Sequence, residues 1–305
     1  MRLDDFDNDI NVSDQGNTGG GGGFGGGGGG GLLFGLLPLI GSRFGCGGIV
    51  VVLLLMAVFG GLGNIGGMLG GGGGSPTSAS REVEGTRTGA AAVCTTDPAK
   101  RAACNAFSSA ENTWQALFAK QGEQFRAPGL VFFDQNGRSG CGAAQAAMGP
   151  FYCPTDSNIY LDTSFFNELA TRFGAQGDFA QYYVVAHEFG HHIQNLTGAA
   201  AQVSRIQQSA GRAEGNAASV RLELQADCYA GVWAAQNRDR LEQGDVEEGM
   251  TAAAAIGDDT LQRQGGGRVS PDSFTHGTSA QRQTWLRRGL QSGDPAQCDT
   301  FSGAI

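Results

Sequence analysis

The glycine residues of this chain are distributed so unevenly that they divide it into two parts with different capacities to fold. Of the 53 glycines among 305 residues, 28 lie before Ser75, and residues 19–31 are glycine interrupted only by Phe24. Such a tract loses much backbone entropy on folding and offers no side chains to bury. We therefore expect residues 1–31, which begin with an acidic stretch, to be a disordered tail, and residues 91–305 to form the folded domain.

An apolar stretch follows the glycine tract. The sequence "CGGIVVVLLLMAVFGGLGNIGGML", which begins at Cys46, contains no charged residue and no histidine. Its dense core, residues 49–59, is too short to cross a bilayer, but residues 45–65 reach the roughly 20 residues required, and membrane helices tolerate glycine. We expect residues 32–69 to be a membrane segment with one span at about 45–65, and residues 70–90 to be a linker. A buried helix of a soluble protein is the alternative.

The cations and cysteines around this segment predict on which side of a membrane the domain lies. Arg43 precedes the apolar stretch and the next cation, Arg81, comes well after it; the positive-inside rule then places the N-terminus in the cytoplasm. Six cysteines follow the segment, and an even number is typical of disulfides in an oxidising compartment. Free thiols or a zinc site are alternatives, although no CxxC pair is present. The expected pairs are Cys94–Cys104, Cys141–Cys153 and, by remainder, Cys228–Cys298.

The pattern after residue 90 predicts an α+β domain. Residues 129–134 and 157–162 have the composition of short strands, and residues 105–120 and 163–174 have helical spacing. Almost everything after residue 174 is helical by pattern, and strands followed by helices are typical of the α+β class. The net charge is −9 and no run is rich in lysine or arginine, so a nucleic-acid partner is excluded.

Three of the four histidines lie within six residues of one predicted helix, in "VVAHEFGHHIQNL" at 184–196. The helix is expected to begin at Asp178 with a capping-box pattern and to end before Gly198. His187 and His191 are four residues apart and therefore share one face. With Glu188 beside the first, they form the HExxH pattern of two zinc ligands and a general base.

Two other interpretations apply to this helix. The histidines could form local hydrogen bonds in a purely structural helix. His192 projects about 100° away from its neighbour, so we interpret it either as a residue that supports a ligand from behind or as a packing residue, and not as a ligand.

A catalytic zinc site requires a third protein ligand. The longer pattern HExxHxxGxxH is excluded, because Gln194 and Thr197 occupy its glycine and histidine positions. A second predicted helix, 219–236, carries Glu223 and Asp227 four residues apart. Glu223 can be the third ligand while Asp227 accepts the free N–H of a ligand histidine. The reverse assignment, and a solvated acidic face, remain open.

The fourth histidine, His276, precedes a predicted C-terminal helix that carries Arg282. A histidine or arginine can stabilise the oxyanion that forms when water attacks a peptide carbonyl, and these two residues are our candidates. Tyr229 is a further candidate donor. Surface positions without a catalytic role are the alternative for His276 and Arg282.

Four stretches together resemble a known family: "GPFYCPTDSNIYLD", "HEFGHHIQ", "RLELQADCYAGVW" and "THGTSAQRQTWLRRG". They are similar to the bacterial predicted neutral zinc metallopeptidases, the YpfJ-like family, over residues 80–302. The resemblance implies a zincin-like fold, with a mixed sheet over the active-site helix and a helical C-terminal part. It also implies a gluzincin-type site, in which Glu223 and not Asp227 is the zinc ligand.

Together these features predict a zinc-dependent endopeptidase anchored by a single pass in the bacterial inner membrane, with its domain on the periplasmic side and a peptide or protein as substrate. We expect an edge strand at 143–151 to bind the peptide. A zinc-stabilised membrane-tethered scaffold without turnover is one alternative function, and a zinc hydrolase of non-peptide cell-wall amides is another. The expected roles are zinc ligation by His187, His191 and Glu223, support by Asp227, general base catalysis by Glu188, and oxyanion stabilisation by His276 and Arg282.

Overall fold

The computed structural model describes residues 1–18 and 87–305 and confirms an α+β domain with a small mixed sheet. Five strands form this sheet in the order β2-β1-β3-β7-β6, and β4 and β5 form a separate antiparallel pair. The strands are β1 (Val12–Asp14), β2 (Arg87–Thr88), β3 (Gly129–Phe132), β4 (Asn136–Ser139), β5 (Gly142–Gln145), β6 (Phe151–Cys153) and β7 (Asn158–Leu161).

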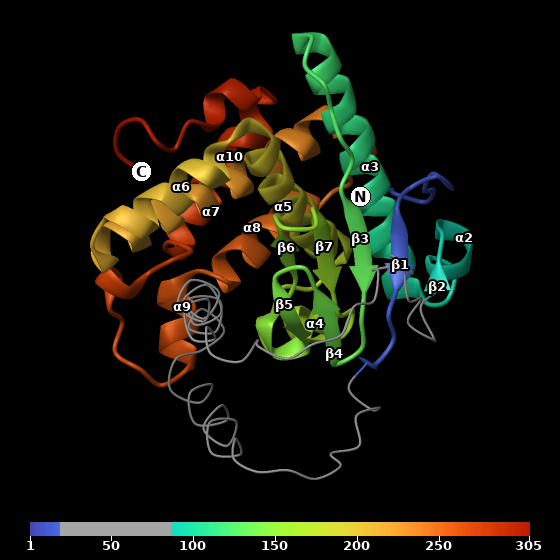
Figure 1. Ribbon diagram of the computed structural model, residues 1–305, viewed down its shortest axis with the longest axis horizontal. Helices are drawn as coiled ribbons and strands as arrows, with labels where there is room; N and C mark the ends of the chain where they lie inside the picture. Colours follow the sequence, from blue (N-terminus) through green and yellow to red (C-terminus); the bar gives the residue numbers. More distant parts are fainter. Residues whose placement is uncertain (19–86) are drawn as a thin grey trace, which may run out of the picture.

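Helices make up most of the described chain. Each helix predicted within the described residues is present, although the helices expected at 105–120 and 219–236 begin earlier, at Pro98 and Arg212. The helices after residue 177 fill one half of the molecule, and the sheet with α3 fills the other (Figure 1). The helices are α2 (Ala90–Val93), α3 (Pro98–Gln121), α4 (Ser164–Thr171), α5 (Asp178–Thr197), α6 (Ala199–Ser209), α7 (Arg212–Gln236), α8 (Asp245–Ala255), α9 (Asp258–Gln264) and α10 (Ser279–Ser292).

The two faces of the sheet pack against different cores. Leu130 and Phe132 of β3 belong to the main core that the sheet shares with the helices. Val131 between them, Tyr160 of β7 and Ala144 of β5 form a second, smaller cluster. This division follows from the two-residue period of a strand. Because both faces are covered, the central strands consist almost entirely of buried residues.

The N-terminal arm, residues 1–18, is part of this sheet, so the prediction of a disordered tail at 1–31 is wrong for these residues. Strand β1 runs parallel to β3, with Val12 opposite Leu130, and antiparallel to β2, with Ser13 opposite Thr88. The predicted linker at 70–90 accordingly ends in a strand. Four apolar side chains of the arm are at most 5% exposed: Met1, Leu3, Ile10 and Val12.

The acidic composition of the arm led to the prediction that it is disordered. Its aspartates are not all solvated, because α3 supplies partners for two of them. The Asp14 carboxylate lies 2.7 Å from Lys100 Nζ, and Asp7 accepts a hydrogen bond of 2.8 Å from Ser108 Oγ. Composition alone could not reveal partners that lie about 90 or more residues away.

The predicted membrane segment at 32–69 lies outside the described residues, as do residues 19–31. Within residues 1–18 and 87–305, no helix combines the length and the apolar character needed to cross a bilayer.

The three predicted disulfides are confirmed: Cys94–Cys104, Cys141–Cys153 and Cys228–Cys298. The first joins the end of α2 to α3, and the second joins the β4–β5 turn to β6. The third ties α7 to the C-terminal segment across 70 residues. In the chain-entropy model it restricts the unfolded chain more than the two short loops do.

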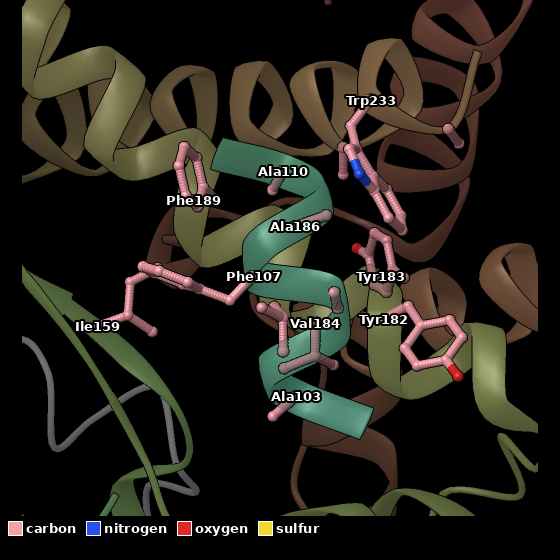
Figure 2. Packing of buried hydrophobic residues seen from close by; sticks show 14 of the residues in the cluster. Ala103, Phe107, Ala110, Ile159, Tyr182, Tyr183, Val184, Ala186, Phe189 and Trp233 are labelled. Carbon is pink, nitrogen blue, oxygen red and sulfur yellow. The ribbon is translucent and has the colours of Figure 1, made fainter. Parts of the chain in front are cut away.

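Helices α3 and α5 pack through a close, largely aromatic and alanine-lined contact. Phe107 of α3 and Phe189 of α5 meet edge to face, with ring centroids 5.5 Å apart. Figure 2 shows Ala103 and Ala110 on the same helix as Phe107, and the Phe107 ring extending toward Ile159 of β7. This packing fixes α5, the helix with three histidines, between the sheet side of the molecule and the later helices.

Helices α7 and α10 touch through their backbones. A Cβ atom on Gly231 of α7 would overlap the carbonyl oxygen of Leu286, and one on Gly289 of α10 would overlap that of Cys228. Only hydrogen fits at these two positions, and the close approach brings Arg282 of α10 against α7.

The arm creates an electrostatic conflict at Glu111 of α3. Among the described residues Glu111 Oε2 has no hydrogen-bond partner, and burial, with the nearby charges of Asp9 and Asp7, raises the pKa of this carboxyl. Ionising this carboxyl therefore costs more free energy in the folded state than in the unfolded state. The folded state loses stability as the pH rises above the pKa that the group has in the unfolded chain. We expect Glu111→Gln to raise the melting temperature at pH 7.5 by about 2 °C.

The gain should shrink as the pH falls toward 4, where the glutamate is protonated in both states. Thermal unfolding at both pH values measures it, and Glu123→Gln at an exposed site is the control. An equal gain at both pH values would show that ionisation of Glu111 is not the cause.

Candidate metal centre

Two helices bring three potential metal ligands together. α5 presents His187 and His191, and α7 presents Glu223. The Nε2 atom of His187 lies 3.1 Å from Glu223 Oε2, and Nε2 of His191 lies 3.5 Å from Glu223 Oε1. The three ligand atoms all lie within 4.8 Å of one another.

These separations fit a zinc ion. Zinc binds imidazole nitrogen and carboxylate oxygen at about 2.0–2.1 Å in tetrahedral geometry, which places neighbouring ligand atoms about 3.3 Å apart. The two observed distances, 3.1 and 3.5 Å, lie on either side of that value. Within the described residues the group contains three ligands and no fourth. Two imidazoles and one carboxylate with an open fourth position are typical of a catalytic zinc site.

The second ring nitrogen of His187 is held by Asp227. His187 Nδ1 lies 2.9 Å from Asp227 Oδ1, and because a carboxylate only accepts, Nδ1 is the donor and Nε2 faces the cluster. Asp227 is fully buried and accepts three more hydrogen bonds, from Tyr183 Oη at 2.5 Å and from Arg282 at 2.8 and 2.9 Å. Of the two assignments left open by the sequence, this geometry favours Glu223 as the ligand and Asp227 as the hydrogen-bond partner of His187.

A glutamine holds the second imidazole. His191 Nδ1 lies 2.8 Å from Gln194 Oε1, while Gln194 Nε2 donates to the carbonyl oxygen of Leu222 at 2.6 Å and to Gln225 Oε1 at 3.2 Å. The amide is thus oriented with its oxygen toward the ring, and Nδ1 of His191 is the donor. Sequence reasoning missed this role for Gln194, although its position three residues after His191 on one helix was an available signal.

The charges in the cluster favour a cation between the imidazoles and the carboxylate. Burial opposes charge on His187, but Asp227 and Glu223 outweigh it and raise its pKa to about 9. Burial likewise opposes charge on His191, whose pKa is raised by Glu223. Burial alone would raise the pKa of Glu223, but His191 and His276 hold it well below its usual range. A divalent cation would displace a proton here, so its affinity should increase with pH.

Glu188 lies beside the cluster on α5. It is 8% exposed, and its carboxylate is near enough to His191 to raise the pKa of that imidazole. Glu188 is not among the three residues of the candidate ligand group.

His276 is fixed by an aspartate that the sequence analysis did not single out. Oδ2 of Asp258, at the start of α9, accepts the backbone N–H groups of Thr275 at 2.7 Å and His276 at 2.6 Å. Its Oδ1 lies 3.2 Å from His276 Nδ1, which leaves Nε2 for other contacts. The charge of His276 lowers the pKa of Glu223, so the ring lies close to the cluster. Sequence reasoning gave no signal for Asp258 beyond its place in a stretch that is largely helical by pattern.

The surroundings of Arg282 do not support its predicted role as an oxyanion donor. The residue is 2% exposed, and its guanidinium also binds Tyr183 Oη and the carbonyl oxygen of Ile256, both at 3.2 Å. It lies on the Nδ1 side of His187, away from the cluster, because the close α7–α10 crossing places it against Asp227. Its role is to neutralise that buried carboxylate.

Two further side chains lie outside the ligand set. His192 Nε2 donates to the carbonyl oxygen of Arg126 at 2.7 Å, and its Nδ1 accepts from Tyr152 Oη at 3.1 Å, so both ring nitrogens have partners outside the ligand group. Tyr229 packs edge-on against Trp114, with centroids 5.1 Å apart, and burial raises its pKa to about 12. This packing does not support an oxyanion role for Tyr229.

A second acidic group lies at the N-terminus of α5 and is already occupied by a cation. Asp178, Asp245 and Glu248 approach one another, and the amino group of Met1 lies 2.7 Å from Asp245 and 3.2 Å from Asp178.

The start of α5 differs from the prediction by one residue. Gly177 is the N-cap, so Asp178 is the first residue of the helix and not the expected capping residue.

Comparison with known proteins gives one family and several relatives. The family model described as "Putative neutral zinc metallopeptidase" matches residues 1–301. The "Uncharacterized protein YpfJ" of Escherichia coli (strain K12) is 54% identical over 200 residues, which cover 65% of this chain and 70% of that protein. The "Uncharacterized protein Rv2575" of Mycobacterium tuberculosis is 45% identical over 210 residues, which cover 65% and 69% of the two chains. No solved structure matches.

Proposed function

Because this chain belongs to the neutral zinc metallopeptidase family, we propose that it is a zinc-dependent endopeptidase with a zincin-like, gluzincin-type site. One observation carries the proposal. The Nε2 atoms of His187 and His191, both on α5, converge on the Glu223 carboxylate of α7 at separations that suit zinc. A buried glutamate, Glu188, adjoins the first of these histidines.

In the proposed reaction, different residues of the chain have different roles. When bound, zinc supplies a Lewis acid that acidifies water and polarises a carbonyl group. Glu188 accepts the proton of the attacking water and passes it to the leaving amine. Asp227 and Gln194 hold the two imidazoles in the tautomer that faces the cluster. His276, oriented by Asp258, donates to the oxyanion.

We propose that the peptide binds along β6. This strand is one of the two edges of the five-stranded sheet, and it pairs with β7 on its inner side. The expected edge strand at 143–151 therefore overlaps β6 only at Phe151, because residues 143–145 lie in β5. Tyr152 of β6 binds His192 and Asn195 of α5, which ties this edge to the helix that carries the site. An extended peptide can add to such an edge through backbone hydrogen bonds.

The test combines metal analysis with substrate cleavage by the full chain, because the N-terminal arm is part of the fold. We expect about one zinc per chain, cleavage of casein or a peptide library, loss of cleavage with a chelator, and recovery with zinc. Zinc without any cleavage would favour the membrane-tethered scaffold. Cleavage confined to non-peptide amides would favour a cell-wall hydrolase.

His276→Ala is expected to lower kcat/KM for a peptide by about 10²-fold, the effect of losing one oxyanion donor. Zinc content should not change, because His276 is not in the ligand group. Asp258→Asn should give a smaller loss, since the ring remains but loses its anionic partner. Steady-state kinetics and zinc analysis measure both variants, and an unchanged kcat/KM in His276→Ala would remove the residue from the mechanism.

A further inference from the structure

The hydrogen bonds behind His191 continue past Gln194 to a second glutamine and a disulfide. We propose that Gln225 is a positioning residue for His191 and acts through Gln194. The two glutamine amides form a relay, and the Cys228–Cys298 disulfide holds its far end. This inference rests on the proposed function, because His191 is one of the three candidate zinc ligands.

Each amide of the relay has a defined direction. His191 Nδ1 donates to Gln194 Oε1 at 2.8 Å, and Gln194 Nε2 donates to Gln225 Oε1 at 3.2 Å. Gln225 Nε2 in turn donates to the backbone carbonyl oxygen of Cys298 at 3.0 Å. A backbone carbonyl can only accept, so it determines which end of the Gln225 amide faces Gln194.

The direction matters because an amide can be reversed with little change in shape. With Gln194 reversed, its NH₂ group would face Nδ1 of His191, and the neutral imidazole would then carry its proton on Nε2. Nε2 is the atom that faces Glu223, and a nitrogen must be deprotonated to bind a metal. The relay therefore maintains the histidine tautomer that zinc requires.

Gln225 shares this role with one other group. Gln194 Nε2 also donates to the carbonyl oxygen of Leu222 at 2.6 Å. The relay is shielded from water, because Gln194 and Cys298 are fully buried and Gln225 is 7% exposed. A buried polar group that loses its partner is left unsatisfied. Loss of Gln225 should therefore weaken the constraint on Gln194 without removing it.

The acceptor at the end of the relay is held against one stripe of α7. Arg221, Gln225 and Cys228 are four and three residues apart, so they share a face of the helix. Cys228 is bonded to Cys298, and Thr300 Oγ1 donates to the carbonyl oxygen of Arg221 at 2.6 Å. The disulfide lies about one helical turn beyond Gln225 and keeps the Cys298 carbonyl within its reach.

The zinc affinity of the full chain, measured by competition with a chromogenic chelator, tests the role of Gln225. Gln225→Met keeps the length of the side chain but removes both hydrogen bonds. We expect the affinity to fall about 10-fold, the lower end of the range for residues behind a metal ligand. Thr300→Val is the matched control, because it removes a neighbouring contact of the same segment and should leave the affinity unchanged. An unchanged affinity in Gln225→Met would overturn the inference.

A double-mutant cycle separates positioning from a general structural role. If Gln225 acts through Gln194, Gln225→Met should have little further effect on zinc affinity in a chain that already carries Gln194→Met. Equal effects in the two backgrounds would mean that Gln225 acts independently of Gln194, and the inference would fail. Because the measured quantity is zinc affinity, the inference can fail in a chain that still cleaves peptides, which leaves the proposed function standing.

Removal of the disulfide tests the far end of the relay. In Cys228→Ser with Cys298→Ser the carbonyl is no longer tied covalently to α7, and we expect zinc affinity to fall by a factor similar to that in Gln225→Met. Cys94→Ser with Cys104→Ser removes the disulfide between the end of α2 and α3 and is the matched control, with the parental affinity expected. Equal affinities in these two double variants would exclude a role of the Cys228–Cys298 disulfide in the relay.

Discussion

Glu188→Gln is expected to lower kcat/KM for peptide cleavage by about 10³-fold or more, within the range for loss of a general acid–base group. Glutamine has nearly the same shape but cannot accept a proton, so the variant removes the proton transfer and little else. Glu188 is not in the ligand group, so zinc content and melting temperature should stay close to those of the parent chain.

Kinetics with a fluorogenic peptide, zinc analysis and thermal unfolding measure the three quantities. Glu247→Gln, at an exposed position on α8, is the matched control and should behave like the parent. Cleavage by Glu188→Gln at the parental rate would exclude the residue as the base. Loss of zinc would instead show that Glu188 contributes to the metal site.

Asp227→Ala is expected to destabilise the domain by about 3–5 kcal/mol, because it leaves the buried Arg282 charge without its partner. His187 and Tyr183 also lose their acceptor. Without the carboxylate the His187 ring is free to rotate, and zinc affinity should fall by about 10–100-fold. Denaturant unfolding and competition with a zinc chelator measure the two effects.

A second substitution separates stability from metal binding. In Asp227→Ala with Arg282→Met the unpaired buried charge is gone, so much of the lost stability should return. Zinc affinity should stay low, because the histidine still lacks its acceptor. Recovery of both quantities together would show that Asp227 acts only as the counter-ion of Arg282.

The approach of His187, His191 and Glu223 was predictable because much of the information for it is local. Spacings of four residues on two helices determine which side chains share a face, whatever the rest of the fold. The choice between Glu223 and Asp227 required tertiary geometry, since both lie on the same face of α7. Gln194 illustrates the limit of motif reasoning: it excluded a longer pattern but was not recognised as the partner of His191.

Sequence reasoning was weakest where distant segments meet. Arg282 was a candidate oxyanion donor, but two glycines bring α10 close to α7, and its side chain is buried there. The N-terminal arm looked too acidic to fold, but α3 supplies a lysine for Asp14 and β3 supplies the neighbouring strand. Neither relationship has a signature in the local sequence.

The position of β1 has a consequence for the order in which the protein can be assembled. Its neighbour β3 lies more than 100 residues later, so the ribosome releases the first strand long before its partner exists. Closing so long a loop is entropically costly and slow. The apolar side chains of the arm therefore stay without this partner until residues 129–132 have been synthesised. The first part of the sheet to leave the ribosome is thus unable to pair with β3 until well over a third of the chain has been made.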